Sequence, residues 1–142
     1  VILLIDEDEL KALPIWVGPF EAHAIGIALQ EIRLERPLTH DLLNNVLSLL
    51  DAKLSMVVIN DVKEGTYFAE LHIWRHNKEL VVDCRPSDAI ALALRTETPI
   101  YLSEKVAEGT LAIEELLNEG QHQELKELLE SGRPNDSKKS LH

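Results

Sequence analysis

Apolar and polar residues alternate with a period of two over residues 54–83, the pattern of β-strands that are buried on one face. Two polar breaks divide this segment, one at Glu64-Gly65 and one over residues 75–78. Each break suits a tight turn between antiparallel strands. The pattern therefore predicts a three-stranded antiparallel meander, with strands at 56–62, 66–74 and 79–83.

A turn at His76-Asn77 sets the pairing of the second and third strands. It produces three apolar pairs on one face, which are Ile73/Leu80, Leu71/Val82 and Ala69/Cys84. A shift by one residue would break this agreement, because side chains alternate between the two faces. The opposite face then carries Trp74/Glu79, His72/Val81 and Glu70/Asp83. The turn at Glu64-Gly65 adds the pairs Glu70/Ile59 and Asp61/Phe68.

Two carboxylates, Glu70 and Asp83, are thus expected to face each other about 5 Å apart at Cβ, with His72 diagonal to Asp83. Like charges in this position are destabilising, so a cation, an arginine or a shared proton must offset them. Mg²⁺ or Mn²⁺ prefers such oxygen ligands. Arg85, two residues after Asp83, is the rival neutraliser on a solvated face, and the spacing favours neither alternative.

The remaining pattern predicts a hairpin and several helices around the meander. Residues 1–5 and 13–17 are expected to pair as strands, and 21–34 carries the apolar stripe of an amphipathic helix. Thr39 is a good N-cap for a helix to about residue 50. Ser87 is expected to cap a buried, wholly apolar helix at 88–95. A short strand at 99–102 and one helical turn at 103–108 follow.

These elements predict an α+β fold, a mixed and largely antiparallel sheet with packed helices in a single compact domain over 1–108. Residues 109–142 are expected to form an acidic helical tail, with helices at 112–118 and 121–130 and a disordered end. A chain of 142 residues buries enough surface for a hydrophobic core without disulfides. Its one cysteine, Cys84, is expected to be a small buried thiol.

Charge and hydropathy limit the partners of the chain. No apolar run approaches the ~20 residues of a membrane span, and a lone cysteine gives no sign of an oxidising compartment, so a cytoplasmic protein without membrane contact is expected. Lys+Arg 14 against Asp+Glu 25 gives a net charge of −11. Nucleic-acid chemistry on such a chain must use local arginines or bound cations, because the overall field repels phosphate.

Other polar positions carry two interpretations each. Arg85, Ser87 and Asp88 open a helix whose N–H groups suit an anion, although plain capping explains the last two equally well. Glu21 and His23 either line a pocket or are a first-turn acid and a surface histidine. His40 and Asp41 suit a helix start. The sequence contains no P-loop, G-x-S-x-G, H-E-x-x-H or paired C-x-x-C motif.

Three stretches together resemble the bifunctional nuclease family over roughly residues 1–108. They are Leu-Pro-Ile-Trp-Val-Gly-Pro-Phe-Glu-Ala (13–22), Arg-Pro-Leu-Thr-His-Asp-Leu-Leu (36–43) and Asp-Cys-Arg-Pro-Ser-Asp-Ala-Ile-Ala-Leu-Ala (83–93). The resemblance implies a compact α+β domain that hydrolyses DNA and RNA and forms a homo-oligomer. The motif positions map onto Glu21, His40, Asp41, Asp83, Arg85, Ser87 and Asp88. The chain begins inside what resembles the family's second strand, and Glu97 stands where the family pattern leads us to expect glycine.

Two functional hypotheses follow. In the first, the protein is a nuclease in which Glu70, Asp83 and Asp88 hold a divalent metal, Mg²⁺ or Mn²⁺. His72 or a metal-bound water then supplies the base, Arg85 stabilises the transition state, and the substrate-binding residues are Arg85, Ser87, Glu21 and His40. The alternative is a non-enzymatic oligomeric interaction or regulatory module, in which Phe68, Trp74 and Ile59 form an interface.

Overall fold

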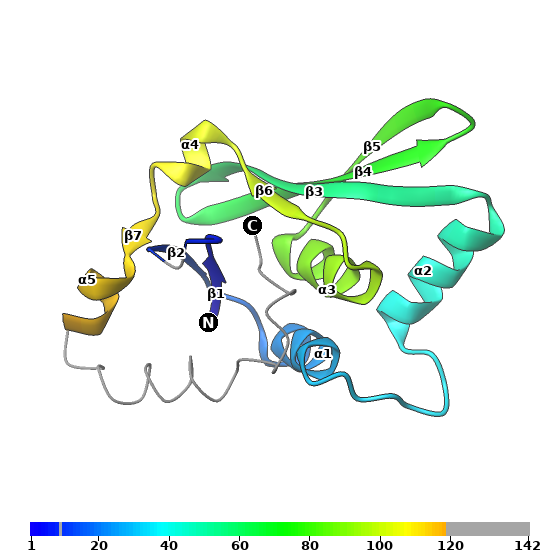
Figure 1. Cartoon of the computed structure of the whole chain (residues 1–142), viewed down its shortest axis with the longest axis horizontal. Helices are drawn as coiled ribbons and strands as arrows, with labels where there is room; N and C mark the ends of the chain where they lie inside the picture. The colour runs from blue at the N-terminus through cyan, green and yellow to red at the C-terminus, as the bar shows by residue number, and fades with distance from the viewer. Residues whose placement is uncertain (9, 119–142) are drawn as a thin grey trace.

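Two β-sheets, three long helices and two short ones make up the part of the chain that the computed structural model describes, residues 1–8 and 10–118 (Figure 1). The larger sheet has the order β5-β4-β3-β6, and the smaller one has the order β1-β2-β7. All neighbouring strands are antiparallel except β3 and β6, which are parallel. The strands are β1 (Ile2–Ile5), β2 (Lys11–Ile15), β3 (Ala52–Lys63), β4 (Thr66–Arg75), β5 (Lys78–Cys84), β6 (Ile100–Leu102) and β7 (Leu111–Ala112). The predicted α+β class is confirmed.

The helices follow the predicted order with shifted ends. They are α1 (Pro19–Leu29), α2 (Thr39–Leu49), α3 (Pro86–Thr96), α4 (Glu104–Ala107) and α5 (Ile113–Asn118). Thr39 is not the N-cap of α2: Leu38 holds that position, and its N–H donates to the Asp41 carboxylate at 2.9 Å. Ser87 is likewise inside α3, which Arg85 precedes as N-cap. Within residues 1–8 and 10–118, no helix is long and apolar enough to cross a bilayer.

The structure tests only part of the predictions for the C-terminal segment. The predicted helix at 112–118 corresponds to β7 and α5, and β7 pairs with β2. The predicted helix at 121–130 and the disordered end lie outside the described residues.

The predicted register of the β4–β5 hairpin is confirmed at every pair, including Leu71 opposite Val82 and Glu70 opposite Asp83. The register of β3 with β4 is confirmed only near the turn, where Asp61 faces Phe68. Beyond it, an irregularity between Ile59 and Asp61 inserts one residue, and Glu70 faces Val58 rather than Ile59. The inserted residue turns Ile59 into the core, where it is fully buried, so it cannot join Phe68 and Trp74 in the predicted interface.

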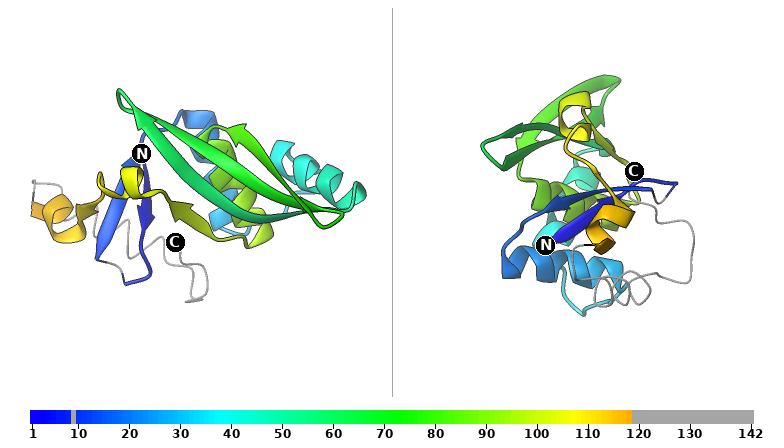
Figure 2. Two further views of the ribbon diagram at one scale, coloured as in Figure 1. Left: turned by 90° about the horizontal axis from the view of Figure 1, so that it is seen from above. Right: turned by 90° about the vertical axis from the view of Figure 1, so that its left-hand side faces the viewer.

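Helix α3 occupies the centre of the fold. The four-stranded sheet covers one side of α3 and α1 covers the other, as the two further views in Figure 2 also show. The segment Ala89–Ala93 is at most 1% exposed, as its wholly apolar sequence predicted. Side chains of the sheet that face α3, among them Val57 and Ile59, are also fully buried. The hydrophobic core therefore forms around one helix, which fixes the position of both its ends.

Substitution of Leu92 by alanine tests this arrangement. Leu92 is 0% exposed, and its truncation should lower the free energy of unfolding by about 2–5 kcal/mol, because the tightly packed core cannot fill the cavity. Urea unfolding followed by circular dichroism measures the loss. Leu10→Ala is the control, since Leu10 is 67% exposed and should change stability by less than about 1 kcal/mol. Equal effects of the two variants would contradict a core built on α3.

Candidate active site

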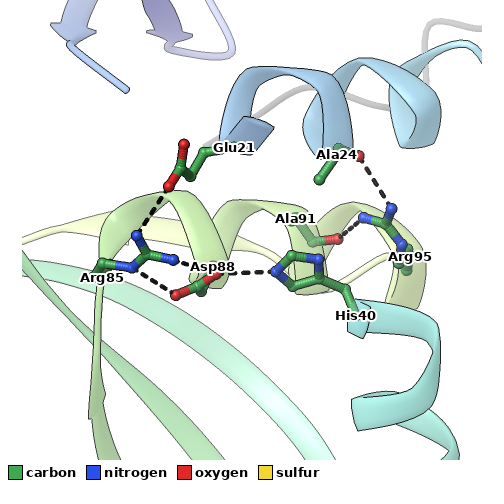
Figure 3. A network of polar contacts seen from close by, with 7 residues as sticks. All are labelled: Glu21, Ala24, His40, Arg85, Asp88, Ala91 and Arg95. Atoms are coloured by element: carbon green, nitrogen blue, oxygen red, sulfur yellow. Dashed lines mark hydrogen bonds and ion pairs between the residues drawn. The ribbon is translucent and has the colours of Figure 1, made fainter. Parts of the chain in front are cut away.

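Arg85 connects three elements at the point where β5 ends and α3 begins. Its Nε donates to Asp88 Oδ2 at 2.9 Å and its Nη2 donates to Asp88 Oδ1 at 3.2 Å, which makes a forked contact within the first turn of α3. Its Nη1 donates to Oε1 of Glu21, in the first turn of α1, at 3.0 Å. Figure 3 shows the guanidinium between these two carboxylates. The side chain of Arg85 is 63% exposed, so one edge of the guanidinium faces solvent.

His40 extends this set of contacts into α2. Its Nε2 lies 3.0 Å from Asp88 Oδ1, and its side chain is 13% exposed. We call the four residues Glu21, Arg85, Asp88 and His40 the Arg85 network. Each of the three sequence stretches that resemble the nuclease family contributes to the Arg85 network, although Glu21 and Arg85 are 64 residues apart and His40 and Asp88 are 48 apart.

A second arginine, at the opposite end of α3, holds the surrounding helices in place. Arg95 is 8% exposed; its Nε donates to Asp41 at 3.1 Å, and its two Nη groups donate to the carbonyls of Ala24 and Ala91 (Figure 3). It thereby connects α1, α2 and α3. Sequence reasoning missed Arg95, and the available signal was a lone basic residue in the last turn of a buried helix.

A pocket of about 300 Å³ lies beside the exposed side of the Arg85 network. Its wall combines the β2–α1 connection, the start of β4 and the start of α3. The lining includes three of the predicted substrate-binding residues, which are Glu21, Arg85 and Ser87. Ser87 is 7% exposed, and its hydroxyl makes no hydrogen bond within the described part of the chain. A hydroxyl at a pocket wall that has no protein partner is available to a polar ligand.

Gly18 makes room for the Glu21 carboxylate at the edge of this pocket. A Cβ atom at position 18 would collide with Glu21 Oε2, so a side chain there would force that carboxylate to move. The Gly-Pro sequence at 18–19 also starts α1, with Pro19 in its first turn. One short connection therefore begins the helix and orients its acid toward Arg85.

The predicted metal ligands do not come together as one site. Glu70 faces Asp83 across β4 and β5, but its carboxylate binds Asn60 and His72, each at 3.2 Å. The other ring nitrogen of His72, Nδ1, lies 2.6 Å from Glu79 Oε1, so the hydrogen-bond partners of both ring nitrogens are carboxylates other than that of Asp83. Asp88 belongs to the Arg85 network. No group of three acidic, histidine or cysteine side chains in residues 1–8 and 10–118 is arranged to hold a metal ion.

The alternative to a metal was that Arg85 neutralises Asp83 on a solvated sheet face. Arg85 does not pair with Asp83. Its carboxylate partners are Glu21 and Asp88, because the chain turns into α3 directly after Arg85 and carries the guanidinium toward α1. The repulsion between Glu70 and Asp83 is offset instead by the hydrogen bonds that Glu70 accepts from Asn60 and shares with His72.

One carboxyl group and one thiol group near α3, those of Asp88 and Cys84, have shifted pKa values. Partial burial by itself would raise the pKa of Asp88, but the hydrogen bonds from Arg85 and His40 outweigh it and hold that pKa below its ordinary value. Burial, followed by the negative charges of Asp88, Asp83 and Glu70, raises the pKa of Cys84 to about 11. Cys84 is therefore a protonated thiol at neutral pH rather than a nucleophile.

Comparison with known proteins places the chain among nuclease-like domains. A sequence model of the bifunctional nuclease domain matches residues 1–114. An uncharacterized protein of Mycobacterium tuberculosis is 39% identical over 147 aligned residues, which cover 97% of this chain and 88% of the relative. Bifunctional nuclease 2 of rice, Oryza sativa subsp. japonica, is 26% identical over 75% of this chain and 34% of its own length. Bifunctional nuclease 2 of Arabidopsis thaliana is 24% identical over 75% and 33%.

The lowered pKa of Asp88 predicts a pH-dependent contribution to stability. Because the folded-state pKa lies below the unfolded value of about 3.9, the contribution is present above pH ~4 and is lost as the pH falls through the folded-state pKa. Arg85→Met removes the main hydrogen-bond donor, so it should raise the pKa of Asp88 and destabilise the fold more at pH 7 than at pH 3. Carboxyl NMR titration and urea unfolding at both pH values measure these changes.

Arg75→Met is the matched control, because Arg75 donates to the backbone carbonyl of Leu50 and has no carboxylate in that contact. Its effect on unfolding should not differ between the two pH values. An Asp88 that titrates at its ordinary value in the unmodified protein would contradict the described network.

Proposed function

The chain belongs to the bifunctional nuclease domain family, and we propose that it hydrolyses phosphodiester bonds of DNA and RNA at the Arg85 network. The observation that carries the proposal is the convergence of Glu21, Arg85, Asp88 and His40 from three distant segments beside a pocket. A purely structural ion pair at this position would not need an adjoining pocket that a serine hydroxyl without a protein partner also lines.

Phosphate binding is assigned to Arg85, Ser87 and the start of α3. A guanidinium has five N–H donors, and the contacts to Glu21 and Asp88 engage three of them, which leaves two for a substrate oxygen. The Ser87 hydroxyl supplies another donor. The backbone N–H groups of Ser87 and Asp88 lie in the first turn of α3, where no helical carbonyl accepts them.

Proton transfer is assigned to Glu21. Its Oε1 is occupied by Arg85, whereas its Oε2 accepts no hydrogen bond within the described residues and lies beside Gly18, which lines the pocket together with Glu21. That oxygen is placed to take a proton from the water that attacks the phosphorus. As the new P–O bond forms, the ester P–O bond to the leaving nucleoside oxygen breaks, and that oxygen takes its proton from solvent. Asp88 and His40 do not line the pocket, so their role is to hold Arg85 in position. Because no three acidic, histidine or cysteine side chains among the described residues are arranged to hold a metal ion, the proposed hydrolysis is not routed through one.

Glu21→Gln should lower the hydrolysis of single-stranded DNA and RNA by roughly 10²-fold or more, because an amide cannot accept the proton of the attacking water. Gly18→Ala should lower it in the same direction, since the new methyl group displaces the Glu21 carboxylate without removing it. The control is Glu79→Gln, a carboxylate on the outer face of β5. Release of acid-soluble nucleotides measures the rate.

The same assay separates this proposal from the predicted metal centre. A Glu70→Gln/Asp83→Asn double variant should keep at least half of the activity, and so should the unmodified protein in excess chelator. If both treatments abolish hydrolysis while Glu21→Gln does not, the reaction belongs to a metal held by Glu70 and Asp83.

We also propose that the protein self-associates through two sets of exposed apolar side chains, one on α2 and one on the edge strand β5. α2 contains no buried residue, and its exposed side chains include Leu42 (55%), Val46 (43%) and Leu49 (82%). β5 is an edge strand on which Leu80, Val81 and Val82 are all at least 40% exposed. Unpaired strand edges and grouped apolar side chains are typical of contact surfaces.

Light scattering tests self-association directly. The unmodified protein should have a mass of at least twice its 16.0 kDa chain mass at micromolar concentration. Val46→Asp/Leu49→Asp should reduce it to one chain mass, because a buried charge in an apolar contact is costly. Leu10→Asp, at a 67% exposed position between β1 and β2, should leave the mass unchanged. A single chain mass for the unmodified protein refutes the proposal.

A further inference from the structure

Two aromatic rings are exposed where β2 ends and α1 begins, and one of them, Trp16, is at the site. Trp16 is 85% exposed and Phe20 is 87% exposed, more than any other large apolar residue among the exposed ones described. Trp16 also lines the 300 Å³ pocket, next to Val17 and Gly18. A tryptophan that is almost fully solvated loses the stabilisation that its burial would give, so the fold by itself does not account for this position.

The pocket places this ring together with phosphate-binding groups. Trp16 comes from the β2–α1 connection, and Arg85 and Ser87 come from the start of α3. An aromatic surface beside an arginine is the combination by which proteins bind single-stranded nucleic acid, because a base stacks on the ring while the backbone contacts the cation. Bases in a duplex are already stacked on each other and are not free to lie on a protein ring.

The charge of the protein favours the same substrate. At a net charge of −11, the chain has no long-range attraction for the dense phosphates of a duplex. Stacking does not depend on net charge, and it adds roughly 1–3 kcal/mol per base in single-strand binding proteins. A site that relies on one stacked base and a few directional hydrogen bonds can therefore bind nucleic acid in spite of the overall repulsion.

We propose that the pocket is specific for single-stranded nucleic acid, with one base stacked on Trp16 and the adjoining phosphate on Arg85 and Ser87. This inference rests on the proposed function, because it assigns the strand class of the same site. Trp16 is the specificity-determining residue in this arrangement, and it takes no part in bond cleavage.

The chain offers a direct readout, because it contains only two tryptophans, Trp16 and Trp74. In a Trp74→Phe variant, all tryptophan fluorescence comes from the pocket. Titration with a phosphorothioate octamer of thymidine, which resists cleavage, should quench this fluorescence in a saturable way. An abasic octamer with the same backbone, and a duplex of the same length, should each bind at least tenfold more weakly.

Substitution of the ring gives the matched comparison. Trp16→Ala should weaken binding of a dye-labelled thymidine octamer by roughly tenfold, while Trp16→Phe should retain most of the affinity. Trp74→Ala is the control, because Trp74 is 47% exposed on the outer sheet face and does not line the pocket. Equal affinity for the abasic and thymidine octamers, equal affinity for duplex, or an unchanged Trp16→Ala variant would each overturn the inference.

These experiments distinguish a failure of the proposed single-strand binding from a failure of the proposed hydrolysis. If Trp16 fluorescence is quenched by the thymidine octamer but no nucleic acid is cleaved, the strand preference stands and the proposed nuclease activity falls. If cleavage is normal but Trp16→Ala changes neither binding nor strand preference, the nuclease activity stands and the role of Trp16 in strand preference falls. A fall in molecular mass on Trp16→Ala, with binding unchanged, would assign the ring to a contact between protein chains and overturn the inference.

Discussion

Burial of α3 between the four-stranded sheet and α1 is the constraint on which the rest of the structure depends. Because the helix is packed along its length, the arginines near its two ends have fixed positions. At one end, Arg85 donates to the Glu21 carboxylate of α1. At the other end, Arg95 donates to the Asp41 carboxylate of α2 and to a backbone carbonyl of α1. The adjacent residues His40 and Asp41 reach toward opposite ends of the same helix. The packing that forms the core therefore also fixes the geometry of the candidate site.

The electrostatics of the site follow from this arrangement. Hydrogen bonds to Asp88 and then Glu21 raise the pKa of Arg85, so the guanidinium stays charged, while the two carboxylates cancel its field at long range. What remains for a ligand is a set of donors in fixed directions. Under the proposed function, this site recognises phosphate through geometry at short distance. This is the form of recognition open to a protein with a net charge of −11, and it explains why an aromatic ring beside the pocket matters.

The sequence predicted those features that depend on local alternation, and it missed those that depend on single insertions or distant contacts. The β4–β5 register followed from three apolar pairs, and the buried α3 followed from its apolar run. The irregularity at Asn60 has no signature in composition, yet it moved Ile59 to the other face. Spacing placed Glu70 opposite Asp83 but could not show that Asn60 and His72 already bind Glu70. The contact of Arg85 with Glu21 spans 64 residues, so only the family resemblance associated them.

The central claim is that phosphate binds where β5 turns into α3. Titration of ¹⁵N-labelled protein with thymidine 3′,5′-bisphosphate, which contains a base and two phosphates but no cleavable diester, tests this most directly by NMR. The largest shifts should occur at the Arg85 Nε–H and at the backbone amides of Ser87 and Asp88. Shifts centred on Glu70 and Asp83, with Arg85 unmoved, would contradict the account and return the chemistry to the outer face of the sheet.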